Sequence, residues 1–206
     1  FHSVGNRILR RHAEKVGLTR SFSIMDREDQ KDLMQACIAS SGVNTKEVRF
    51  PKPDLLSTMF SLSENTGETM QDILEYRYPY FLDLKEPIKK VREEYKKRKI
   101  ETNSADFDDL LILCVKLLKK HDDILEMYQQ QFQFVLVDEY QDTNHVQSKL
   151  ISLLSGKYKN LMVVVKADAY GHGLLNVVNI LASNKDLIFC TFSIEEALEI
   201  RKNGIV

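Results

Sequence analysis

The amino-acid sequence predicts an α/β protein that is mostly helical. Two observations predict this class. Apolar residues recur at helical spacing through much of the chain before residue 134. After that point, helical patterns alternate with short apolar runs, which are typical of strands buried on both faces of a parallel sheet. We therefore expect a helical region followed by a β-α-β-α-β-α region, with strands at residues 134–137, 161–165 and 187–190.

Composition limits the classes of function. Hydrophobic residues make up 43% and charged residues 29% of the 206 residues, which is ordinary for a globular protein. No apolar run approaches the ~18 residues of a membrane span, so we expect no membrane partner and a cytoplasmic location. The net charge of −1 gives no global basic field, but one groove can be basic on a neutral protein. Because the first residue is Phe1 and not Met, we expect the natural chain to begin upstream.

The N-terminal part predicts two helices. Residues 1–18 are expected to form the first, with Gly17 as its stop. The second should begin after Asp26, a good N-cap, with Asp29 as a first-turn carboxylate. The apolar residues of the first helix recur at helical spacing: Val4, Ile8, Leu9 and Val16.

The middle of the chain predicts shorter elements and then two longer helices. We interpret the charged helix at 85–99 as a solvated face. The next helix should begin near Ser104 and bury one stripe, made of Phe107, Leu110, Leu111, Cys114, Leu117 and Leu118. Before them, residues 43–80 should form short helices and turns, because helix breakers interrupt them: Pro51, Pro53, Gly67 and Pro79.

The final helix should open at a capping box, Ser193-Ile194-Glu195-Glu196. The three cysteines are scattered, and each lies among apolar neighbours. We interpret them as reduced core residues, not ligands or disulfides: Cys37, Cys114 and Cys190.

Two adjacent acids, Asp138 and Glu139, follow the expected strand at 134–137. Ligands of open parallel sheets bind at the carboxyl ends of the strands. An acid pair there suits a magnesium nucleotide, because one acid can hold the metal and the other can orient or deprotonate the attacking water. By spacing alone, a strand that simply ends in polar residues explains the pattern equally well.

The wider pattern resembles UvrD/Rep/PcrA-type superfamily 1 DNA helicases. The run Val137-Asp138-Glu139-Tyr140-Gln141-Asp142-Thr143-Asn144, followed by Gln147, resembles their Walker B motif. Three further segments occur in the family's order. They resemble the early DNA-side motif (Phe1-His2-Ser3, then Ile8-Leu9-Arg10), the entry to the inserted 1B subdomain (Phe22 to Asp26) and the return from it (Asp106 to Leu111).

This resemblance implies roles for individual residues. Asp138 would hold Mg²⁺, Glu139 would be the general base for ATP hydrolysis, and Gln141 would lie near the γ-phosphate. Phe1 and His2 would lie close to single-stranded DNA, and the 1B subdomain would face the duplex.

The resemblance also implies a division of the chain. It predicts part of a RecA-like motor domain with a helical 1B insertion. The motor fragment would start at 1–19, the 1B subdomain would occupy 20–104, and the motor domain would return with Walker B at 105–164. Residues 165–206 would form a further segment outside the helicase pattern.

The phosphate-binding loop of the family, G-x-x-x-x-G-K-[ST], does not occur in the 206 residues. Gly156-Lys157 is followed by Tyr158 and lacks a glycine five positions earlier. The second motor domain and its arginine finger are also missing. We therefore expect no ATP hydrolysis from this chain alone.

A second resemblance covers about residues 162–206 and therefore begins within the expected strand at 161–165. The run Val165-Lys166-Ala167-Asp168-Ala169-Tyr170-Gly171-His172-Gly173 resembles the pyridoxal phosphate lysine motif of alanine racemase, at the mouth of a (β/α)8 barrel. The later runs Cys190 to Glu199 and Gly204-Ile205 resemble that family's next strand and helix.

The racemase resemblance implies that Lys166 is the Schiff-base lysine and that Tyr170 lies near pyridoxal phosphate. Without it, a lysine that extends to solvent would be the ordinary interpretation. The segment would be a β-α-β-α piece of the barrel. The other strands, the phosphate-binding loop and the opposing tyrosine are absent, so we expect no racemase activity.

The Val-rich strand at 161–165 satisfies both families, so their join breaks no local pattern. A gene fusion, an assembly artefact and a designed chimera all remain open. A three-stranded sheet covered on one side would expose apolar surface, so we expect marginal stability or self-association. A non-catalytic module that binds DNA or a partner is a third interpretation, in which Arg7, Arg10 and Arg11 meet phosphates or form a solvated face.

Overall fold

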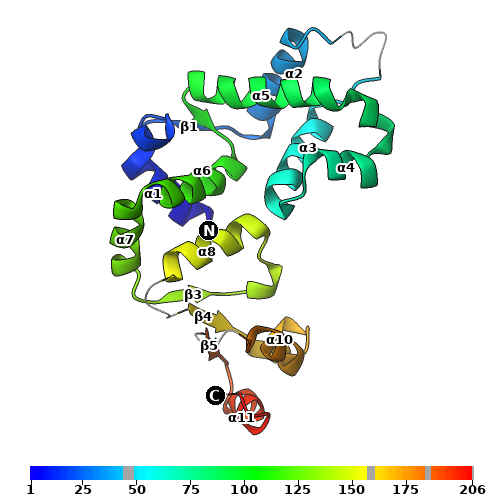
Figure 1. Cartoon of the computed structure of the whole chain (residues 1–206). Helices are drawn as coiled ribbons and strands as arrows, with labels where there is room; N and C mark the ends of the chain where they lie inside the picture. Colours follow the sequence, from blue (N-terminus) through cyan, green and yellow to red (C-terminus); the bar gives the residue numbers. More distant parts are fainter. Residues whose placement is uncertain (44–48, 157–160, 184–186, 206) are drawn as a thin grey trace. The chain divides into compact units, whose positions relative to one another are not determined.

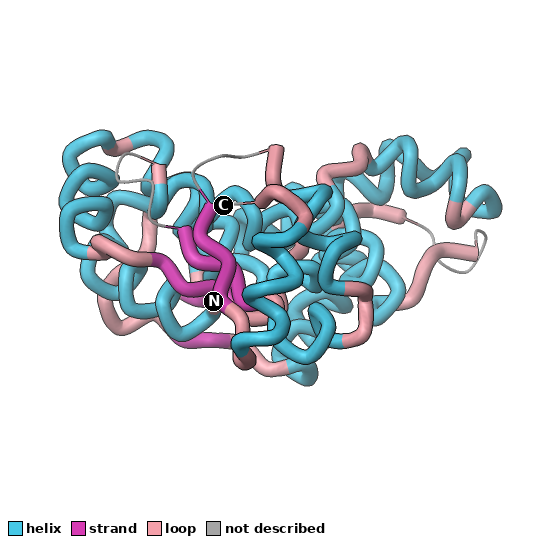
Figure 2. The backbone as a smooth tube through the Cα atoms, turned by 90° about the horizontal axis from the view of Figure 1, so that it is seen from below, coloured by secondary structure: helices cyan, strands magenta, loops and turns pink. Residues whose placement is uncertain are grey.

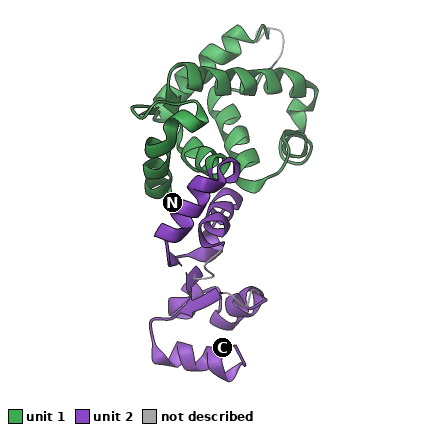
Figure 3. Ribbon diagram, turned by 60° about the vertical axis from the view of Figure 1, so that its left-hand side comes forward, with its two compact units in different colours: residues 1–117 green, residues 118–206 purple. Residues whose placement is uncertain are grey.

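The computed structural model describes residues 1–43, 49–156, 161–183 and 187–205. The chain divides into two compact units, Phe1–Leu117 and Leu118–Val206 (Figure 3). Within the described ranges, none of the helices combines the length and the hydrophobicity that a bilayer crossing needs.

Unit 1 begins with the predicted helix. The α-helix α1 spans His2–His12, and a 3-10 helix, η1 (Ala13–Val16), continues it. Gly17 ends the run with a φ of +82°, a conformation that favours glycine, which confirms the predicted stop.

Arg10, at the end of α1, is held by the protein itself. Its Nη1 donates to the carbonyl oxygens of Arg20 (2.8 Å) and Phe22 (3.1 Å), and its guanidinium lies 4.4 Å from the centre of the Phe22 ring. This side chain therefore fixes the loop that follows η1 through its Nη1.

A helical bundle forms the rest of unit 1 (Figure 1). The predicted caps at Asp26 and Asp29 form a capping box, and a second box joins Thr69 and Asp72. The core of this helical bundle is apolar, and its fully buried side chains include Met34, Cys37, Leu56, Met59, Ile73, Leu74, Ile88 and Val91. The elements are α2 (Arg27–Ser40), α3 (Pro53–Thr66), α4 (Met70–Tyr76), η2 (Pro79–Leu84) and α5 (Lys85–Glu101).

Two short parallel strands join the chain where it enters and leaves this bundle. They are β1 (Ser23–Ile24) and β2 (Ser104–Ala105). The helix expected near Ser104 therefore begins later, as α6 (Phe107–Lys120), because Ser104 pairs with Ser23 and Asp106 caps the helix.

Helix α6 buries the predicted stripe except for its first residue. Phe107 is 54% exposed, while the other five stripe residues are buried. The backbone of α6 approaches α1 closely, since a Cβ added to Gly5 would lie 2.7 Å from the carbonyl oxygen of Leu110. Gly5 thus permits the contact of the two helices.

Unit 2 contains the predicted β-α-β-α-β-α region. Its three strands, among those drawn in magenta in Figure 2, are parallel in the order β3-β4-β5. Leu136, Met162 and Ile188 lie in register across them. The elements are α7 (Asp122–Gln131), β3 (Val135–Val137), η3 (Tyr140–Asp142), α8 (His145–Ser155), β4 (Leu161–Val164), α9 (Lys166–Tyr170), α10 (Leu174–Leu181), β5 (Leu187–Cys190) and α11 (Ile194–Lys202).

Only one face of this sheet is well covered. Val137, Leu161 and Val163 are buried in a core that α8, α10 and α11 complete. Because strand side chains alternate between faces, Leu136 and Ile188 point the other way, and they are 63% and 41% exposed. This confirms the expected exposure of apolar surface on the sheet.

The cysteines are free. Cys37 and Cys114 are buried, as expected of core residues, whereas Cys190 is half-buried on β5.

Candidate functional site

The residues predicted for two different sites meet at one edge of the sheet in unit 2. Asp138 directly follows β3, and Lys166 lies two residues beyond the end of β4. The Tyr170 hydroxyl donates a hydrogen bond to Oδ1 of Asp138, and the Lys166 ammonium lies 4.0 Å from its Oδ2. The parallel arrangement explains the meeting, because neighbouring parallel strands end at the same edge.

The second acid is held by its own loop. Glu139 has a φ of +54°, which is uncommon for a residue other than glycine and costs of order 1–3 kcal/mol. The Gln141 Nε2 donates to the Glu139 carboxylate over 3.3 Å. A capping box formed by Asn144 and Gln147 then starts α8 and anchors the end of this loop.

Lys166 opens a turn with left-handed backbone. Ala167, Asp168, Ala169 and Tyr170 all have φ between +50° and +56°. This conformation costs roughly 1–2 kcal/mol per residue other than glycine, so surrounding contacts must hold it.

Two carboxylates stabilise the turn. The Asp168 carboxylate accepts a hydrogen bond from the backbone N–H of Leu174 over 2.6 Å. Glu196 accepts from the backbone N–H of Asp168 over 3.0 Å and also caps α11 from within its capping box. The hydrogen bond from the backbone of Asp168 is the largest of the effects that lower the pKa of Glu196.

The contact with Asp138 also changes the acidity of Tyr170. Its hydrogen bond to Asp138, followed by partial burial and the charges of Asp138 and Glu139, raises the pKa of Tyr170 to about 12. In this contact the phenol is the donor.

This arrangement does not fit a magnesium ion. Mg²⁺ needs several oxygen ligands at 2.0–2.1 Å in octahedral geometry. Here one Asp138 oxygen accepts from a hydroxyl and the other faces an ammonium. Within the residues that the structure describes, no three His, Cys, Asp or Glu side chains group closely enough to hold a metal ion.

Nor does the turn fit the phosphate of pyridoxal phosphate. A phosphate site needs free backbone N–H groups or cations. The N–H of Asp168 donates to Glu196, that of Ala169 donates to Val165 O, and that of Gly171 donates to Ala167 O. Those N–H groups are already used inside the protein.

Phe1 and His2 belong to unit 1. Phe1 precedes α1 and is 41% exposed. The His2 ring lies edge-on to Phe107, with 6.0 Å between the ring centroids. Of the two residues expected near DNA, His2 thus contacts the start of α6, in the segment expected to return from the insertion.

A buried ionic cluster in unit 1 was not predicted. Lys99 is 6% exposed. Its ammonium lies 2.6 Å from Asp106 and 2.5 Å from Asp109, and the Tyr95 hydroxyl also donates to Asp106, over 3.2 Å. Burial lowers the pKa of Lys99, but the charges of Asp109 and Asp106 outweigh it and raise that pKa overall.

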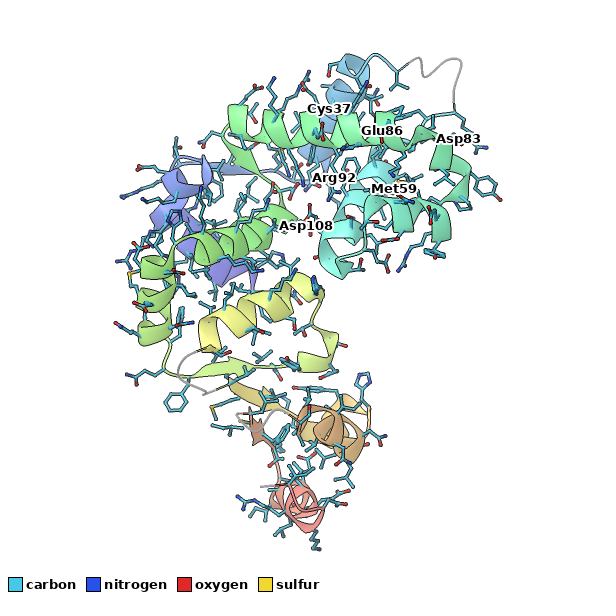
Figure 4. All side chains as sticks on the ribbon, in the orientation of Figure 1. Cys37, Met59, Asp83, Glu86, Arg92 and Asp108 are labelled. Atoms are coloured by element: carbon cyan, nitrogen blue, oxygen red, sulfur yellow. The ribbon has the colours of Figure 1, made fainter. Side chains whose placement is uncertain are left out.

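The sequence held a signal for this lysine. Ile88, Val91, Tyr95 and Lys99 recur every three or four residues and are all buried. The buried stripe of α5 therefore ends on Lys99, although most other residues near it are charged. A cavity of about 40 Å³ adjoins the cluster, and Arg92 and Asp108, labelled in Figure 4, both line it. Its lining mixes acids and bases, so it indicates no class of ligand.

Comparisons with known proteins identify the two resemblances. The model of the UvrD/REP helicase N-terminal domain matches residues 1–170, and the model of the alanine racemase N-terminal domain matches residues 144–206. The two matches overlap at residues 144–170, which contain β4.

Individual relatives agree with the first match. ATP-dependent DNA helicase PcrA of Staphylococcus aureus is 34% identical over 188 residues, which are 90% of this chain and 25% of that protein. PcrA of Staphylococcus epidermidis is 35% identical over the same length. The chain thus spans about a quarter of the length of these curated relatives. Because the helicase match covers most of its residues, the chain belongs to the UvrD/REP helicase N-terminal domain family.

Proposed function

We propose that this chain is a piece of an ATP-dependent DNA helicase motor and does not hydrolyse ATP on its own. The observation that carries the proposal is the acid pair Asp138-Glu139 at the carboxyl end of a parallel strand, in a chain of the UvrD/REP family. That edge is where α/β sheets bind ligands. The sequence contains no G-x-x-x-x-G-K-[ST] loop, so the cationic cradle for a triphosphate is missing.

The proposed roles belong to an intact motor. There Asp138 is the metal ligand, Glu139 the general base and Gln141 the residue near the γ-phosphate, while Phe1 and His2 face single-stranded DNA. The compartment would be the cytoplasm.

The proposed division of the chain follows the same assignment. Residues 1–19 and 105–164 are parts of a RecA-like domain, and residues 20–104 are its 1B insertion. Residues 165–206 are a piece of a (β/α)8 barrel.

The experiment that tests this is a graft. Residues 1–164 replace the aligned segment of Staphylococcus aureus PcrA, which supplies the phosphate-binding loop and the second motor domain. We expect ATP hydrolysis that single-stranded DNA stimulates, and a loss of at least about 100-fold in kcat in Glu139→Gln, since general-base catalysis contributes about 10²–10⁴-fold.

Two outcomes would refute the proposal. One is a folded graft that binds DNA yet shows no hydrolysis. The other is ATP hydrolysis by the isolated chain that disappears in Glu139→Gln.

A second candidate function is a fragment of an alanine racemase. The match over residues 144–206 and the lysine at the strand end favour it. We expect no racemase activity, because the 206 residues lack the other barrel strands, the phosphate-binding loop and the opposing tyrosine. A new visible absorbance on adding pyridoxal phosphate, lost in Lys166→Ala, would contradict this expectation.

A further inference from the structure

We propose that Lys166 and Tyr170 take the place of a metal ion beside Asp138, so that the C-terminal segment closes the acid edge of this chain to divalent cations. The inference rests on the proposed function, because it takes Asp138 as the metal-binding acid of the helicase motif. It adds that two residues in the overlap of the helicase and racemase matches, Lys166 and Tyr170, pair with that acid.

The geometry carries the inference. The Tyr170 hydroxyl donates to Oδ1 of Asp138, so the proton on that hydroxyl lies where a cation would approach the oxygen. The Lys166 ammonium adds a positive charge 4.0 Å from Oδ2. A divalent ion at Oδ1 would have to displace the hydroxyl, and one at Oδ2 would be repelled by the ammonium.

The turn that carries Tyr170 is held in place by contacts other than the one with Asp138. Asp168 and Glu196 hold its left-handed backbone through hydrogen bonds, and Ala169 is fully buried. The Lys166 ammonium lies 5.6 Å from the centre of the Tyr170 ring, within the range of a cation–π contact. The hydroxyl and the ammonium therefore reach Asp138 as one unit.

The pairing of Asp138 with Tyr170 and Lys166, and not burial, is what excludes divalent cations from this edge of the sheet. The Asp138 side chain is 59% exposed and that of Lys166 is 41% exposed, so water and ions can reach both. Glu139 is occupied separately by Gln141. Removing the Tyr170 hydroxyl and the Lys166 ammonium should therefore make the Asp138 carboxylate available to a cation without changing the structure of the sheet.

Manganese binding tests the proposal. Free Mn²⁺ gives an electron paramagnetic resonance signal that weakens on binding, and it stands in for Mg²⁺. We expect no saturable site in the unaltered full chain. Lys166→Met combined with Tyr170→Phe should create a saturable Mn²⁺ site that is at least about fivefold tighter than the detection limit set for the unaltered chain, because it removes a repulsive charge about 4 Å from the site. Adding Asp138→Asn should abolish the gain.

The matched control is Lys149→Met combined with Tyr76→Phe. It removes an exposed lysine and an exposed tyrosine elsewhere. We expect it to bind Mn²⁺ no better than the unaltered chain. Saturable binding in the unaltered chain that Asp138→Asn abolishes would overturn the proposal, as would a folded Lys166→Met, Tyr170→Phe variant with no gain in affinity.

If that double variant does not fold, single variants provide a second measurement. Lys166→Met alone and Tyr170→Phe alone should each bind Mn²⁺ more tightly than the unaltered chain, and adding Asp138→Asn should remove the gain. Folded single variants that bind Mn²⁺ no better than the unaltered chain would overturn the pairing. The helicase graft contains neither Lys166 nor Tyr170, so its result does not depend on this one.

Discussion

At the scale of single residues, two lysines have different environments. Lys99 is buried against Asp106 and Asp109, whereas Lys166 is partly exposed and faces Asp138. A buried charge that loses its partner is costly, while an exposed ion pair contributes about 0–1 kcal/mol. Lys99 should therefore matter for stability, and Lys166 for what binds at the sheet edge.

Lys99→Met should destabilise unit 1 by about 3–5 kcal/mol, because it leaves the carboxylates of Asp106 and Asp109 buried without a cation. Urea unfolding followed by circular dichroism measures the loss, and hydrogen exchange assigns it to unit 1. The control is Lys97→Met, which removes an exposed lysine 3.6 Å from Glu101 on the same helix. Equal effects of the two substitutions would contradict the buried-cluster interpretation.

At the scale of elements, the left-handed turn is the least ordinary local structure. Ala167, Asp168, Ala169 and Tyr170 adopt a conformation that glycine accepts more readily. Their tertiary hydrogen bonds offset this cost, so the turn depends on α10 and α11, which supply the partners of Asp168.

Ala167→Gly should stabilise unit 2 by about 0.5–1 kcal/mol, because Ala167 is exposed and its φ of +51° is strained for a side chain. Ala197→Gly, in the middle of α11, should instead destabilise it by about 1 kcal/mol. Chemical denaturation of the two variants beside the unaltered chain measures both signs. If Ala167→Gly destabilises the protein as much as Ala197→Gly does, the turn is not left-handed.

Glu196 gives the turn a dependence on pH. Hydrogen bonds from Asp168 and from its own capping box lower the pKa of Glu196 below its ordinary value of 4.5. A lowered folded-state pKa stabilises the fold fully above the ordinary value, and the contribution is lost as pH falls through the lowered value. The stability difference between the unaltered chain and Glu196→Gln should therefore shrink on acidification below about pH 4. A difference independent of pH, in denaturation series between pH 3 and 7, would show that the charge is not involved.

At the scale of the whole molecule, the open face of the sheet in unit 2 is the main liability. Leu136 and Ile188 lie in register with Met162 and are exposed, and β3 and β5 are both edge strands. Exposed apolar faces and unpaired strand edges favour association.

We expect the chain to self-associate in a concentration-dependent way, and Leu136→Lys with Ile188→Lys to reduce this. Sedimentation velocity over a range of concentrations measures it. Tyr80→Lys, at an exposed position in unit 1, is the control and should leave association unchanged. A chain that stays monomeric throughout would remove this prediction.

Several features followed from local patterns alone. The stop at Gly17, the N-cap at Asp26, the capping box at Ser193 and the three parallel strands are confirmed. Each depends on residues close in sequence or on a simple alternation of apolar residues. The predicted start of α6 was wrong by a few residues, because Ser104 pairs with Ser23 of β1, which is far away in the sequence.

The sequence by itself determined the membership of the chain in a helicase family and the position of an acid pair and a lysine at strand ends. Only the tertiary structure decided that Asp138 meets Lys166 and Tyr170, and that Lys99 is buried between carboxylates. The physical reason is that periodicity and capping act over a few residues, whereas which side chain neutralises a carboxylate depends on which strands and helices end side by side.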